Sequence, residues 1–227
     1  MSTHISHNIQ LILKELAPFK CQLIAVTKTR SIDELLSTYE AGILDFGENR
    51  VQEMLEKQPK LPVNIRWHQI GHLQTNKVKY IAPFVHLIHS VDSLKLLQEI
   101  NKEAKKNNRI IPCLLQIYIA QEESKFGLDR KELLDLLTNP TLSDLKNIQI
   151  IGLMGMASFT ENQRQIQQEF TSLKLLFDEL SSQHVGEFQG NVQWKELSMG
   201  MSGDYLLAAE QGSTMVRVGS AIYGPRK

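Results

Sequence analysis

The sequence predicts an α/β fold, a (β/α)8 TIM barrel with an extra helix at its N-terminus. Short apolar runs alternate with segments of helical periodicity along all 227 residues, and this alternation is typical of parallel strands joined by right-handed crossovers. The apolar runs number eight, as closure requires, and the length lies near the lower end of the range for this barrel. Because no linker rich in Pro, Gly or Ser interrupts the chain, we predict a single domain over residues 1–227.

The expected strands are the eight apolar runs, and each is followed by turn residues or a helical pattern. They are 22–27, 43–46, 65–70, 86–90, 111–119, 148–154, 192–198 and 214–218. A doubly wound open sheet is the alternative arrangement of such strands. No G-x-G-x-x-G motif follows the first run, which disfavours a dinucleotide-binding version of that sheet.

The helices between these runs carry start and stop signals. Ser31 and Glu34 have the spacing of a capping box, and Gly42 supplies the stop of the same helix. Asp92 is placed to cap the helix after the fourth run. Apolar residues at helical spacing also mark 94–104, 166–180 and, before the first strand, 5–16.

Composition excludes several classes of function. The net charge of +0 gives no basic excess for nucleic acid, no apolar run approaches the length of a membrane span, and the N-terminus lacks a signal-peptide pattern. Only Cys21 and Cys113 could pair. Cys113 falls in an expected strand and Cys21 directly precedes one, so we expect free buried thiols and a cytoplasmic protein.

The loops after the last two strands have the features of an anion site. The segment "SMGMSG" supplies the hydroxyls of Ser198 and Ser202, and Gly219 and Ser220 stand where a short helix can begin. Backbone N–H groups at a helix start bind anions, and in this barrel the corresponding loops frequently hold phosphate. The pattern therefore favours a phosphorylated ligand, although plain glycine turns would look similar.

Lys28 follows the first strand, at the end of the barrel where reactive groups gather. A lysine in that environment can lose its proton and attack a carbonyl to form a Schiff base. A phosphosugar or pyridoxal 5'-phosphate would suit both Lys28 and the phosphate loops. Arg217, on the last strand, can point inward at a ring nitrogen and favours pyridoxal 5'-phosphate.

Six motifs in fixed order resemble the pyridoxal phosphate homeostasis proteins, single-domain relatives of the alanine racemase N-terminal barrel. They are "AVTK", "FGENRVQE", "WHQIGHLQTNK", "LMGMAS", "LSMGMSGDY" and "VRVGSAIYG". The resemblance spans nearly the whole chain. It implies a protein that binds pyridoxal 5'-phosphate covalently, affects cellular vitamin B6 balance and has no established catalytic turnover.

The resemblance also assigns residues. Lys28 matches the lysine of the internal aldimine, Arg217 the arginine facing the pyridine nitrogen, and Asn49 the asparagine of the "GEN" motif near the ring. Ser202, Gly219 and Ser220 match phosphate-holding positions, with Ser198 as a further candidate. The chain departs from the family pattern at Ser220, where threonine is common, and at His72, where an apolar or small residue is common. Ser220 keeps the hydroxyl.

Three functions fit this pattern. The first is a carrier or regulator that buffers pyridoxal 5'-phosphate and passes it to apo-enzymes, for which we expect a monomer. The second is a pyridoxal phosphate-dependent racemase or decarboxylase, which normally needs a second acid/base residue from an additional β domain. The sequence ends directly after its last barrel motif, which favours the first. The third is a Schiff-base aldolase, which would not need Arg217.

The remaining polar residues give weaker signals. His68 and His72 have the i, i+4 spacing of helical zinc ligands, but His68 falls on an expected strand, so we predict no metal site. His86 and His89 should lie on opposite faces of a strand, one exposed and one in the core. Lys125, in "SKFG", lies in a loop at the barrel mouth.

Overall fold

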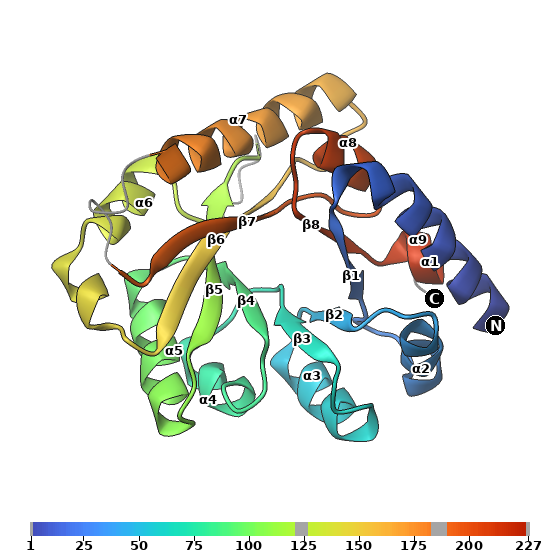
Figure 1. The fold of residues 1–227 in the computed structure, drawn as a ribbon, viewed down its shortest axis with the longest axis horizontal. Coiled ribbons are helices and arrows are strands. Elements are labelled where there is room, and N and C mark those ends of the chain that lie inside the picture. Colours follow the sequence, from blue (N-terminus) through green and yellow to red (C-terminus); the bar gives the residue numbers. More distant parts are fainter. Residues whose placement is uncertain (1, 121–126, 183–189, 226–227) are drawn as a thin grey trace.

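The chain folds into a closed barrel of eight parallel strands, with β1 to β8 in sequence order around the ring and β8 paired with β1. The structure is a computed structural model that describes residues 2–120, 127–182 and 190–225. The predicted fold class is therefore confirmed (Figure 1). Lys125 lies outside the described residues.

The strands correspond closely to the eight apolar runs. They are β1 (Gln22–Val26), β2 (Asp45–Glu48), β3 (Arg66–Gln69), β4 (Leu87–Val91), β5 (Ile111–Tyr118), β6 (Ile148–Met156), β7 (Val192–Ser198) and β8 (Met215–Val218).

The helices lie outside the ring of strands (Figure 1). They are α1 (Ser2–Leu16), α2 (Ile32–Glu40), α3 (Val51–Lys57), α4 (Val78–Ile81), α5 (Leu94–Lys106), α6 (Arg130–Leu137), α7 (Gln163–Ser182), α8 (Tyr205–Glu210) and α9 (Ser220–Tyr223). The expected extra helix is α1, which lies beside α9 in Figure 1. The Asn8 amide donates a hydrogen bond to the Ile222 carbonyl (2.9 Å), so the first and last helices are joined. In the part of the chain that is described, no helix has both the length and the apolarity to cross a membrane.

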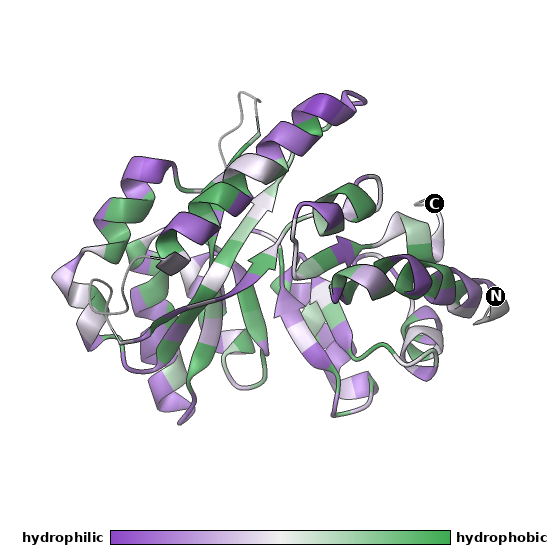
Figure 2. Cartoon of the chain, turned by 45° about the horizontal axis from the view of Figure 1, so that its top comes forward, coloured by the Kyte–Doolittle hydropathy of each residue, from purple (hydrophilic) through white to green (hydrophobic). Residues whose placement is uncertain are grey.

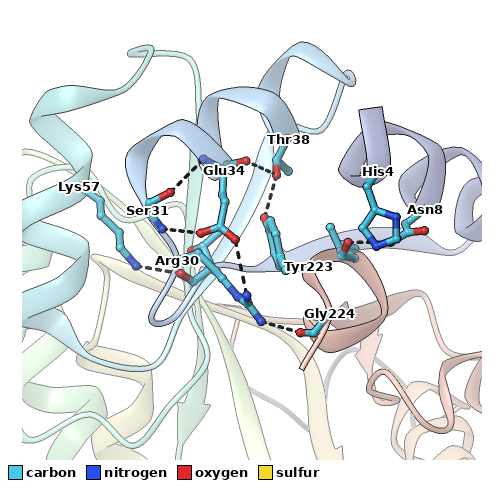
Figure 3. Close-up of polar contacts among 11 residues, drawn as sticks. His4, Asn8, Arg30, Ser31, Glu34, Thr38, Lys57, Tyr223 and Gly224 are labelled. Carbon is cyan, nitrogen blue, oxygen red and sulfur yellow. Dashed lines mark hydrogen bonds and ion pairs between the residues drawn. The ribbon is translucent and has the colours of Figure 1, made fainter. Parts of the chain in front are cut away.

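The capping box that begins α2 is confirmed. The Glu34 N–H donates to Ser31 Oγ (3.3 Å), and the Ser31 N–H donates to Glu34 Oε2 (2.8 Å; Figure 3). Beyond the end of α2, Gly42 has φ +94°, a conformation that favours glycine. The prediction for α5 was wrong by one residue. Its N-cap is Ser93, whose Oγ accepts from the Leu96 N–H (3.3 Å), because the Asp92 carboxylate is turned toward His72 instead.

The second strand was also misplaced, since it runs over Asp45–Glu48 and not over 43–46. The strand can begin and end with a charged residue because both charges are paired. Asp45 lies opposite Arg66 in the β2–β3 register, and Glu48 accepts a hydrogen bond from Lys57 of α3. Gly47 lies within the strand. A Cβ there would come within 3.1 Å of Ile24 and 3.0 Å of Ile70.

The barrel has two apolar regions, one outside and one inside the sheet. The larger cluster joins the outer faces of the strands to the helices, and Figure 2 shows apolar residues concentrated where the two layers meet. A second cluster comes from five strands that can meet only inside a closed ring: Ile24, Leu87, Leu114, Met154 and Met215. This interior cluster closes the barrel and forms the floor beneath polar residues near the carboxyl ends of the strands.

Candidate functional site

A cavity of about 410 Å3 opens at the carboxyl ends of the strands, the end at which barrels of this type carry their sites. Six of the seven predicted site residues line it: Lys28, Asn49, Ser202, Arg217, Gly219 and Ser220. The seventh, Ser198, is fully buried at the end of β7 and lies beneath Arg217 instead of on the cavity wall.

Lys28 and Arg217 reach this cavity from neighbouring strands. Ile24 of β1 lies opposite Arg217 of β8, and side chains alternate along a strand, so Ile24, Val26 and Lys28 share the inward face. Lys28 is two residues beyond the end of β1 and is half-buried. The amine and the guanidinium therefore face one space from different heights along the barrel axis.

The guanidinium of Arg217 is buried and held at two points. Its side chain is 3% exposed, Nη1 donates to Ser198 Oγ (2.5 Å), and Nη2 donates to the Gly155 carbonyl (2.9 Å). Burial lowers the pKa of Arg217 to about 10, an effect that the carboxylate of Asp204 opposes. Arg217 thus stays protonated at neutral pH in a fixed orientation.

The predicted anion loops come together through Ser202. Its Oγ accepts from the N–H groups of Gly219 (3.0 Å) and Ala221 (3.3 Å), which ties the loop after β7 to the loop after β8. The short helix α9 begins at Ser220, as expected. Ser202 and Ser220, one from each loop, consequently line the same cavity.

Asn49 is positioned by two residues that the sequence did not single out. The Gln69 side chain donates to the carbonyls of Asn49 (3.1 Å) and Gly71 (2.9 Å). A Cβ at Gly71 would lie 2.5 Å from the Asn49 carbonyl oxygen, so only glycine lets the two backbone segments approach this closely. The adjacent letters "QIG" in the motif after β3 are the signal that could have found this clamp.

Two charged cavity residues were missed as well. Arg30 lines the wall, where it donates to the Gly224 carbonyl (2.6 Å), pairs with Glu34 (3.5 Å) and lies over the Tyr223 ring (Figure 3). Asp204 accepts from the Met201 N–H (2.5 Å), and burial raises its pKa. Each lies two residues after a residue that we did select, Lys28 or Ser202, at the same mouth.

The histidines around β3 and β4 differ in exposure to solvent. His86 is exposed and His89 is fully buried, as predicted. His72 is 57% exposed and pairs with Asp92 at the surface (3.4 Å), so its departure from the family pattern lies outside the cavity lining. His68, also fully buried, points into the barrel interior, where its ring contacts His89.

Comparison with known proteins connects this geometry to a family. Residues 2–227 match the family model "Alanine racemase, N-terminal domain". A "Pyridoxal phosphate homeostasis protein" from Aquifex aeolicus is 40% identical and covers 91% of this chain and 87% of its own length. A protein of the same name from Synechocystis is also 40% identical and covers 92% and 93%, respectively.

This chain belongs to the pyridoxal phosphate homeostasis protein family. The resemblance found in the sequence motifs is thereby confirmed. The relatives of this family are named as homeostasis proteins and not as catalysts, in agreement with the expectation that the chain is not an enzyme.

Solved structures agree with the family assignment. PipY of Synechococcus elongatus, determined with PLP bound, is 34% identical with a TM-score of 0.84, and the match covers 97% of this chain and 100% of PipY. The structure of PipY without PLP gives a TM-score of 0.87 over the same shares of the two chains. Alanine racemase from Bartonella henselae, at 19% identity and a TM-score of 0.72, shares the fold and is 59% covered.

Proposed function

We propose that this protein binds pyridoxal 5'-phosphate covalently through the amine of Lys28. We further propose that it acts in the homeostasis of this cofactor inside the cell, as a carrier or regulator without catalytic turnover. One observation carries most of the argument. An amine from β1, a fixed guanidinium from β8 and hydroxyls from the last two loops converge on one cavity. The PLP-bound structure of PipY, a relative at 34% identity, supports the same choice of ligand.

The donors around the cavity suit this cofactor. Lys28, Arg30 and Arg217 supply three cationic side chains against the single carboxylate of Asp204 among the described lining residues. A phosphate requires positive charge and N–H or O–H donors, which Ser202 and Ser220 add to. An aldehyde requires an amine, and Lys28 places one at the mouth.

Each residue then has a separate role. Lys28 attaches the aldehyde carbon, and Ser202, Gly219 and Ser220 hold the phosphate. Asn49 lies against the ring. Ser198 acts from beneath, by fixing Arg217. When bound, pyridoxal 5'-phosphate supplies an electron sink for carbanions, provided that its ring nitrogen is protonated. Arg217 has no acceptor atom and donates only, so it keeps that nitrogen unprotonated and favours binding over turnover.

The amine is tested by replacing Lys28 with Ala. Purified parent protein mixed with pyridoxal 5'-phosphate should gain a visible absorption band, and borohydride should fix the cofactor to the peptide that contains Lys28. Lys28→Ala should lose both, whereas Lys60→Ala, at an exposed surface lysine, should behave as the parent. Retention of the same reducible band by Lys28→Ala would refute the assignment.

The proposal extends to the partners of the protein and to its location in the cell. We propose that apo-enzymes dependent on pyridoxal 5'-phosphate receive the cofactor, that the protein acts as a cytoplasmic monomer, and that neither nucleic acid nor a membrane takes part. Loaded protein should restore activity to an apo-enzyme faster than spontaneous release of the cofactor allows. Equal rates of activation with loaded protein and with spontaneously released cofactor would mean that the protein buffers the cofactor without transferring it directly. The alternative, a racemase or decarboxylase, is tested by incubating the loaded protein with amino acids.

A further inference from the structure

A row of buried polar side chains crosses the barrel interior from the amino end of β2 to Arg217. Asp45 Oδ1 lies 3.0 Å from His68 Nε2, and His68 Nδ1 lies 2.9 Å from His89 Nε2. His89 Nδ1 in turn lies 3.0 Å from Ser198 Oγ, which accepts from Arg217 Nη1 at 2.5 Å. All five residues are at most 4% exposed. Four consecutive hydrogen bonds therefore connect five strands: β2, β3, β4, β7 and β8.

The two ends of this row fix the direction of every hydrogen bond between them. A guanidinium can only donate, so Ser198 Oγ must accept from Arg217 and give its own hydrogen to His89 Nδ1. A carboxylate can only accept, so Asp45 must receive the hydrogen on His68 Nε2. His89 Nε2 then donates to His68 Nδ1. The opposite direction would give Ser198 two incoming donors and no acceptor for its hydroxyl hydrogen among these contacts.

The protonation states agree with this direction. Burial disfavours ionisation of Asp45, but hydrogen bonds from His68 and Arg66 outweigh it and hold the pKa of this carboxyl below its usual range. Burial, together with the nearby positive charge of Arg217, lowers the pKa of His89 well below its ordinary value. His89 is consequently neutral and has one nitrogen that donates and one that accepts.

At the Asp45 end of the row, the residue types are those of a metal site, but the oxygen atoms of Asp45 already accept hydrogen bonds from Arg66. Asp45, His68 and His86 offer ligand atoms within 4.8 Å of one another. Arg66 occupies both carboxylate oxygens of Asp45, with Nε 2.6 Å from Oδ1 and Nη2 2.5 Å from Oδ2. A cation would have to displace this guanidinium, so the cluster is better explained as the anchored end of the row.

We propose that Asp45, His68 and His89 are positioning residues that form, with Ser198, a one-directional hydrogen-bond chain to Arg217. The hydrogen-bond chain fixes the plane of the guanidinium and ties its orientation to the carboxylate of Asp45. Hydrogen bonds in series polarise one another in a low-dielectric interior. The orientation of Arg217 toward the ring nitrogen of pyridoxal 5'-phosphate thus depends on a carboxylate at the far end of the barrel. The effect on pyridoxal 5'-phosphate rests on the proposed function, whereas the hydrogen-bond chain itself does not.

The chain is tested first in the unmutated protein without cofactor. Long-range 1H–15N NMR spectra of protein labelled at histidine show which ring nitrogen carries the proton. We expect both His68 and His89 to be neutral at pH 7.5, each with its hydrogen on Nε2. A hydrogen on Nδ1 of either residue, or a doubly protonated His68 ring, would overturn the proposal. This measurement requires neither a variant nor a ligand.

The influence of Asp45 on Arg217 is tested with Asp45→Asn, which keeps the shape of the carboxylate but removes its charge. We expect a mixed tautomer at His68 and a loss of roughly 2- to 30-fold in affinity for pyridoxal 5'-phosphate, with a shifted absorption band. His72→Gln, at an exposed histidine outside the chain, should change neither readout. If Asp45→Asn alters the tautomers but leaves affinity and spectrum unchanged, the link to the cofactor fails. If the unmutated protein binds no pyridoxal 5'-phosphate, the proposed function fails instead.

Discussion

Lys57 and Arg217 are both buried cations of this barrel, but their charges are balanced in different ways. Lys57, 7% exposed on the last turn of α3, donates directly to the carboxylates of Glu48 (2.7 Å) and Glu53 (3.1 Å) and to the Thr27 carbonyl (2.8 Å). Arg217 forms no ion pair among the described residues, and its bonds go to a hydroxyl and a carbonyl.

The difference reflects which side of the sheet each cation faces. Lys57 lies outside the barrel, between β2 and α3, where direct pairing compensates the cost of burying charge. Arg217 lies inside and borders the cavity. A guanidinium already paired with a carboxylate would have less positive potential to offer a ligand, so neutral partners keep Arg217 available. Direct pairing thus indicates a structural role, and neutral partners indicate a binding role.

The sharpest test of this contrast is Lys57→Met. The change removes the partner of Glu48, which is fully buried and whose Oε2 already has no hydrogen-bond partner in the described structure. Loss of one member of a buried ion pair costs about 3–5 kcal/mol. Urea denaturation should report that loss in the free energy of unfolding, with the exposed variant Lys60→Met close to the parent. A change below about 1 kcal/mol would show that Lys57 is not structural.

Arg217→Met should have a smaller effect on stability and a larger one on binding. The substitution removes a charge that burial already disfavours and leaves only Ser198 and Gly155 without their donor. Each of these two acceptors left without a donor costs about 1–3 kcal/mol. Relief of the buried charge offsets that cost, so the net loss of stability should stay below that of Lys57→Met. Denaturation and cofactor titration should be measured on the same preparation. A stability loss equal to that of Lys57→Met, with cofactor affinity intact, would reverse the roles of the two cations.

The smallest expected effect is the pH dependence of stability due to His89. Its pKa is depressed in the folded protein, so below about pH 6.5 the unfolded chain takes up a proton that the folded chain refuses. Stability should therefore fall as pH decreases from 6.5, by at most about 1.4 kcal/mol per pH unit for this group. The pKa of His86 is also lowered, to about 4, because its imidazole is partly shielded from solvent although the residue as a whole is exposed, so His86 adds to the same slope.

Urea midpoints at pH 7.5 and 5.5 measure this slope, and the difference between the parent and His89→Gln isolates the contribution of His89. The variant should lose less stability on acidification than the parent does, while His72→Gln should match the parent. Parallel slopes in all three proteins would mean that His89 is not held neutral by the fold.

The sequence predicted the elements better than their ends. Alternation of apolar runs with helical spacing is a local pattern, and it gave all eight strands and the capping box at Ser31. The strand at Asp45–Glu48 was predicted two residues too early, at 43–46, because the charged Glu48 was left outside an apolar run that already contained Asp45. Their partners, Arg66 and Lys57, lie on other elements, so no local pattern could show that burial of these charges was compensated.

The candidate site could also be predicted from local sequence patterns, but only in part. The sequence by itself determined which residues stand at the carboxyl ends of the strands, because strand periodicity and a parallel barrel place Lys28, Ser202 and Ser220 at one mouth. Only the tertiary structure decided that Arg30 and Asp204 share that mouth and that Asp45 is linked to Arg217. Residues 45 and 217 are connected through side chains on five strands. Such contacts depend on strand register and on ring closure, which are set by the packing of the whole chain and not by any segment of it.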